Sequence, residues 1–152
     1  MTPATSTEEP RHLRLTLGLV IAAFVALVAY WFVWFFVDRE SLASLDTPAY
    51  YAFENAFPAA DAWLATACAL GAWALWKRRG TALFWLLVGG SSSVYLGLMD
   101  VLFDLENRVY LAPKGDVGAV VTEAAINVAS LGIGAWALWF GWHSRRWFLG
   151  RE

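Results

Sequence analysis

Residues 81–107, TALFWLLVGGSSSVYLGLMDVLFDLEN, decide the fold of this chain. The stretch is aliphatic and aromatic at its start, small and hydroxylated in its middle, and acidic at its end. At helical spacing, one face carries Gly89, Ser93, Gly97, Asp100 and Asp104. The pattern predicts a helix in lipid with a groove of small residues that leads to carboxylates. Carboxylates in hydrocarbon are expensive and are usually placed against partners or water.

The composition of the whole chain is that of a membrane protein. Of 152 residues, 59% are hydrophobic and 16% are charged, whereas a soluble domain of this length carries more charge. Four apolar runs, each close to or above the ~20 residues that cross a bilayer, cover residues 15–37, 58–76, 81–102 and 117–142. We predict an all-α integral membrane protein, a bundle of four transmembrane helices without a separate soluble domain.

The segments around these runs complete the predicted domain organisation. Residues 1–10 are rich in Thr, Pro and Glu and are expected to form a disordered tail. The transmembrane domain then spans residues 11–146, and residues 147–152 are a cytoplasmic tail. In the first outer loop, Thr47 is a candidate N-cap and Pro48 suits a first helical position, which predicts a short interfacial helix over 48–57. This helix is either an ordinary interfacial segment or a lid over the helix ends.

The basic residues predict the orientation in the membrane. Eight of the 11 Lys and Arg fall on the side that holds both termini and the turn at 77–80. The positive-inside rule therefore predicts cytoplasmic termini, in a plasma (inner) membrane. The first apolar run is too long for a signal peptide and lacks a cleavage site, so we interpret it as a retained anchor helix.

Polar residues inside the apolar runs predict a site. A rise of about 1.5 Å per residue places Asp61, Asp100, Glu123 and Asn127 in one layer near the outer side of the membrane. The helices that carry them each present a face that is acidic outside and small further in. We predict an outward-facing acidic cavity, walled by the second, third and fourth helices. Its candidate ligand-binding residues are Glu123, Asn127, Asp100, Asp61, Ser93 and Glu54.

Several carboxylates in one cavity need neutralisation. Either one of them is protonated or a cation binds between them. Oxygen ligands suit Ca²⁺ or Mg²⁺ better than zinc, and the predicted metal ligands are Asp100, Asp61 and Glu123. Alternatively, each acid lies hydrated in the headgroup zone or pairs with Arg39, Arg108 or Lys114. We expect this second arrangement for Asp104 and Glu106.

Three functions remain open from the sequence. The first is binding or transport of a cation, a proton or a small cationic or amphiphilic ligand. The second is a membrane enzyme that performs acid–base chemistry on a lipid-like substrate with Glu123 and Asp100. The third is a structural subunit of a larger membrane complex. Nucleotide, zinc and serine-nucleophile motifs are missing from the sequence.

The expected partners follow from the same features. The lipid bilayer is the first of them, and a small amphiphilic or cationic ligand is the second. Four helices form a thin bundle, so a homo-oligomer or a partner membrane subunit is also expected. Nothing in the sequence indicates a nucleic-acid partner.

Overall fold

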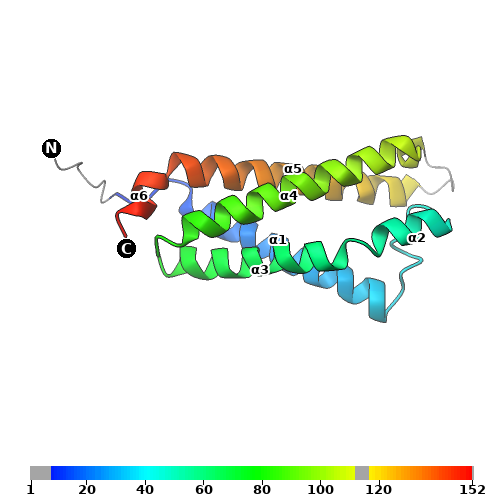
Figure 1. Ribbon diagram of the computed structural model, residues 1–152, viewed down its shortest axis with the longest axis horizontal. Helices are drawn as coiled ribbons and strands as arrows, with labels where there is room; N and C mark the ends of the chain where they lie inside the picture. The colour runs from blue at the N-terminus through cyan, green and yellow to red at the C-terminus, as the bar shows by residue number, and fades with distance from the viewer. Residues whose placement is uncertain (1–7, 112–116, 152) are drawn as a thin grey trace.

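All regular structure in the described residues, 8–111 and 117–151 of a computed structural model, is helical. The elements are α1 (Leu13–Phe36), α2 (Pro48–Glu54), α3 (Pro58–Trp76), α4 (Ala82–Glu106), the short 3₁₀ helix η1 (Val109–Leu111), α5 (Val117–His143) and α6 (Arg145–Leu149) (Figure 1). By length and composition, α1, α4 and α5 could each cross a membrane. The 19-residue α3 is less apolar and is not among these three.

The long helices pack in a definite order of neighbours. Helix α4 lies along α5 over most of its length and also contacts α3, which in turn packs against α1. Helices α1 and α5 touch each other only slightly. Side chains of α1 and α5 therefore do not fill the space between these two helices by packing against each other.

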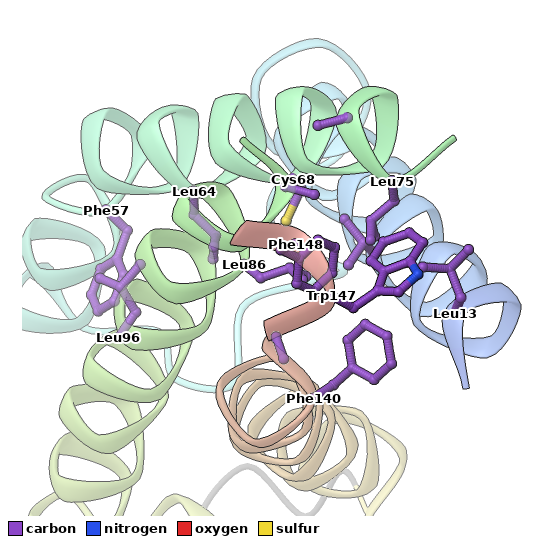
Figure 2. Close-up of a cluster of buried hydrophobic side chains, with 14 residues drawn as sticks. Leu13, Phe57, Leu64, Cys68, Leu75, Leu86, Leu96, Phe140, Trp147 and Phe148 are labelled. Atoms are coloured by element: carbon purple, nitrogen blue, oxygen red, sulfur yellow. The ribbon is translucent and has the colours of Figure 1, made fainter. Parts of the chain in front are cut away.

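The end of the molecule that carries α6 is closed by hydrophobic packing. The start of α1 and the α3–α4 turn lie there, joined by a 2.6 Å ion pair between Arg78 and Glu9. Trp147 and Phe148 of α6 point into the cluster beside Leu75 (Figure 2) and are almost completely buried. Residues 147–149, within the segment predicted as a cytoplasmic tail, thus belong to a packed helix, because these two aromatic side chains bury their surface in the cluster with Leu75 and Phe140.

The opposite end, which carries α2, is held by aromatic residues of α1. Trp34, Tyr50 and Val109 form a second buried cluster there. The predicted start of the short helix is confirmed, since the Tyr50 backbone N–H donates to the Thr47 hydroxyl at 3.2 Å. The helix ends at Glu54, three residues before the predicted end.

Helix α4 is longer than the apolar pattern predicts. It continues through Glu106 instead of ending near residue 102. Asp104, which lies beyond the predicted apolar run, therefore belongs to the helix. Residues 112–116, which include Lys114, lie outside the described residues.

The small residues of α4 allow a close approach to α5. A Cβ atom on Gly97 would lie 3.2 Å from side-chain atoms of Leu131 and Ser130. The Ser93 hydroxyl donates to the Ser130 carbonyl at 2.8 Å. Gly97 and Ser93 of the small-residue groove thus contact α5, which is the close approach that small residues allow between helices in lipid.

Candidate functional site

A cavity of about 410 Å³ lies among the first five α-helices in the part of the chain that the structure describes. Its four carboxylates come from one residue each of α2, α3, α4 and α5, and they are Glu54, Asp61, Asp100 and Glu123. Hydroxyl groups of Tyr30, Ser93 and Ser130 also line it. The rest of the lining is mainly aliphatic and aromatic. Five of the six predicted ligand-binding residues thus share one cavity, while the sixth, Asn127, is buried behind its wall.

Two of the cavity carboxylates are positioned by neighbouring residues of α1. The Tyr30 hydroxyl donates to Glu54 Oε2 at 3.1 Å. The Trp31 indole N–H donates to Asp61 Oδ2 at 2.9 Å. These two bonds tie α1 to α2 and α3, and they fix both carboxylates at the α2 end of the cavity.

Glu54 is placed to change its charge near neutral pH. Burial raises the pKa of Glu54 to about 7, and the nearby charge of Glu123 acts in the same direction. Hydrogen bonds from Tyr30 and Tyr50 lower the pKa, but by less. Burial also raises the pKa of Tyr50, so this phenol remains a neutral donor.

Three carboxylates gather at the interface of α4 and α5. Asp100, Asp104 and Glu123 each present one oxygen, and the three oxygens lie within 4.8 Å of one another. Asp100 and Asp104 are four residues apart on α4, so they share a face. The expectation that Asp104 is hydrated is wrong, because this side chain is only 1% exposed. Asp104 is the third carboxylate of the cluster, the position that the sequence predicted for Asp61. Asp61 lies apart on α3, where it accepts a hydrogen bond from Trp31.

The cluster is surrounded by neutral hydrogen-bond donors. The Asn127 amide N–H₂ donates to Asp104 Oδ2 at 2.7 Å and to the Tyr110 hydroxyl at 2.9 Å. The Ser44 hydroxyl donates to Glu123 Oε2 at 2.6 Å. Burial and the hydrogen bond with Asp104 raise the pKa of Tyr110 to about 12, so Tyr110 adds no charge.

No described Lys or Arg forms an ion pair with any carboxylate of the cavity or the cluster. The one ion pair found in residues 8–111 and 117–151 joins Arg78 to Glu9 at the α6 end. The predicted alternative, pairing with Arg39 or Arg108, is therefore not formed. The cluster has an excess of negative charge that the described part of the protein does not neutralise.

Sequence reasoning missed three members of this site. Ser44 reaches Glu123 from the loop before α2, and Tyr110 reaches Asn127 from η1. Neither contact has a sequence signal, since each joins segments that are distant in the chain. Asp104 did have a sequence signal, because it shares the helical face of Asp100.

No family model, curated protein or solved structure matches this chain. A fold alone does not define a function. The function must therefore be inferred from the cavity and its carboxylates.

Ser44→Ala is expected to loosen the loop at residues 38–47 from α5. It removes the hydroxyl that donates to the buried Glu123 carboxylate, and a bond to a charged group contributes about 1.5–3 kcal/mol. Hydrogen–deuterium exchange of the loop backbone should become faster, and the melting temperature should fall. Ser41→Ala is the matched control, because the Ser41 hydroxyl is exposed and donates only within its own turn. Equal exchange in both variants would show that the Ser44 bond does not hold the loop.

Proposed function

We propose that this chain is a multi-pass membrane protein that binds a cationic amphiphile in the cavity. The ammonium group faces the carboxylates at the α2 end, and the apolar part lies along α1 and α5. The observation that carries the proposal is the combination, in one cavity, of four carboxylates with walls that are otherwise apolar. A site of this kind favours a ligand with one positive and one apolar end.

The membrane arrangement supports this function. We propose that α3 crosses the bilayer together with α1, α4 and α5, and that both termini are cytoplasmic, as the basic residues predict. Asp100 and Glu123 each lie six residues from a helix end, which is about 9 Å along the axis. Carboxylates at that depth need a counter-charge, and a cationic headgroup supplies one.

The route into the cavity lies between α1 and α5. Ala26 and Ala29 of α1 and Ala129 of α5 line the cavity and are exposed. These small side chains leave a side opening between two helices that barely touch. The two alanines of α1 border this opening. In a bilayer the opening faces lipid, so an amphiphile can enter without passing through water.

The size of the cavity limits the ligand. A volume of about 410 Å³ is near the lower end of the range for small-molecule sites, about 300–1,000 Å³. A single-chain amine therefore fits this site better than a two-chain lipid. We test the proposal with dodecylamine and two matched ligands, neutral dodecanol and anionic dodecanoate.

Dodecylamine is expected to bind the full chain in nanodiscs saturably, and about tenfold tighter at pH 8.5 than at pH 5.5. Glu54 gains its charge as the pH rises through its pKa of about 7. The ammonium stays protonated over this range, like a lysine side chain with a pKa of about 10.4. Glu54→Gln should weaken binding at the higher pH and flatten the pH profile. Other titratable groups around Glu54 lie on α1, α2, α4 and α5, and they are Tyr30, Tyr50, Asp100, Asp104 and Glu123.

The control variant is Glu40→Gln, which changes an exposed carboxylate in the same connection between α1 and α2. It should bind dodecylamine as the parent does. The ligand controls test the charge, since dodecanol should bind more weakly and dodecanoate more weakly still. Equal binding of all three ligands would refute the proposed function.

A further inference from the structure

We infer that Asp100, Asp104 and Glu123, together with the amide oxygen of Asn127, form a calcium site between α4 and α5. The site is separate from the amphiphile cavity at two of its four ligands, because Asp104 and Asn127 do not line the cavity. The inference does not rest on amphiphile binding.

The spacing of the carboxylates suits calcium. Their oxygens lie within 4.8 Å of one another. At Ca–O distances of about 2.3–2.6 Å, two ligands on opposite sides of the ion are about 5 Å apart. The separations of the three carboxylate oxygens therefore match those around a bound Ca²⁺. For Mg²⁺, every pair must lie within about 4.2 Å, and the ion also demands octahedral geometry.

Asn127 provides independent support for a ligand at this position. The residue is 97% buried, and its amide oxygen Oδ1 has no hydrogen-bond partner. Leaving such an acceptor unsatisfied costs about 1–3 kcal/mol. The nitrogen of the same planar amide donates to Asp104, so the unpartnered oxygen lies next to the carboxylate cluster. Amide carbonyl oxygens are ordinary ligands of calcium.

Reversing the Asn127 amide does not remove this problem. The oxygen would then face Asp104 Oδ2 at 2.7 Å, where two acceptors repel unless Asp104 carries a proton. The nitrogen would become the unpartnered group. A bound cation satisfies the amide oxygen and all three carboxylates at once.

The charge of the surroundings points to the same ion. The three acids have no basic partner among the described residues, and a cation bound between them stabilises their charged forms. One Ca²⁺ neutralises most of the cluster, since two of its three negative charges are balanced. Glu54 and Asp61, which line the cavity outside the cluster, then remain for the ammonium group of an amphiphile.

The experiment titrates CaCl₂ into the full chain, purified in detergent and treated with EDTA, by isothermal titration calorimetry. One Ca²⁺ per chain should bind, more tightly than Mg²⁺ supplied as MgCl₂ at equal ionic strength. Asp104→Asn should weaken Ca²⁺ binding at least about tenfold, since loss of an outer-shell partner alone costs about 10–100-fold in metal affinity. Glu106→Gln, which removes an exposed carboxylate of the same helix, should leave it unchanged.

Dodecylamine binding by the Asp104→Asn variant separates this inference from the proposed function, because Asp104 lies outside the cavity lining. The variant should lose calcium and keep the amine. Absence of saturable Ca²⁺ binding by the parent up to about 10 mM, above the range of weak calcium sites, overturns the inference. Equal affinities for Ca²⁺ and Mg²⁺ also overturn it. Both of these results are measured on the unmutated protein, so they do not depend on whether the Asp104→Asn variant folds.

Discussion

Gly134→Ala is expected to separate α4 from α5 and to destabilise the protein strongly. A Cβ atom on Gly134 would lie 2.9 Å from the Gly90 carbonyl oxygen and 3.0 Å from the Val94 backbone nitrogen. Backbone atoms cannot rotate away as a flexible side chain can, so the helices must move apart. Overpacking typically costs about 1–3 kcal/mol, and contacts with rigid backbone place this variant toward the upper end of that range. The melting temperature of the purified protein and its yield as a monodisperse species measure the effect.

Gly132→Ala is the matched control for this variant. Gly132 lies on the same helix, and nothing is within 4 Å of the position its Cβ would take. Alanine is a better helix former than glycine by about 0.5–1 kcal/mol, so this variant should melt at the same temperature as the parent or higher. If Gly134→Ala also melts like the parent, α4 and α5 do not cross as closely as described.

Asp100→Asn is expected to stabilise the protein in the absence of divalent cations and to abolish stabilisation by Ca²⁺. The charges nearest to Asp100 are all negative, and they belong to Glu123, Asp104, Glu54 and Asp61. At an effective dielectric constant near 20, two such charges at this spacing repel by about 3 kcal/mol. Removing one charge without changing the shape of the side chain should therefore raise the melting temperature in EDTA at alkaline pH.

The pH dependence of this gain has a definite sign. At low pH the carboxylates carry protons, so the repulsion is relieved and the two proteins should melt alike. The control is Asp61→Asn, which lies in the cavity but outside the cluster and can still accept the bond from Trp31. Its gain should be smaller. A lower melting temperature for Asp100→Asn in EDTA would contradict the repulsion on which the calcium inference depends.

The elements of the fold could be predicted from the sequence because each depends on local properties. Apolar runs of membrane length predicted four transmembrane helices, and three helices of the structure are long and apolar enough to cross a membrane. Thr47 and Pro48 marked the start of α2 through cap chemistry between near neighbours. The positions at which the helices end were less predictable. Helix α4 runs on to Glu106, since contacts of Asp104 with Asn127 stabilise a turn that hydropathy alone would exclude.

The site was partly predictable for the same reason. Helical periodicity placed Asp100 and Glu123 on polar faces, and depth counting put them in one layer. Which third acid lies beside Asp100 and Glu123 depends on how the helices are rotated and how they cross. The rotation and crossing depend on the side chains of both packed helices. The close approach at Gly90 and Gly134 sets α4 against α5. It brings Asp104 into the cluster and leaves Asp61 across the cavity on α3.

The sequence by itself determined that the chain is helical and apolar enough to enter a membrane, and that acids interrupt its apolar faces. Composition and a 3.6-residue period are sufficient for these statements, since they concern one segment at a time. Only the tertiary structure decided that α1 and α5 stand apart, that Ser44 and Tyr110 reach the acids, and that Asn127 has an unpartnered oxygen. Those features join segments as far apart as 79 residues. The packing of all the helices sets such distances, and no single segment encodes them.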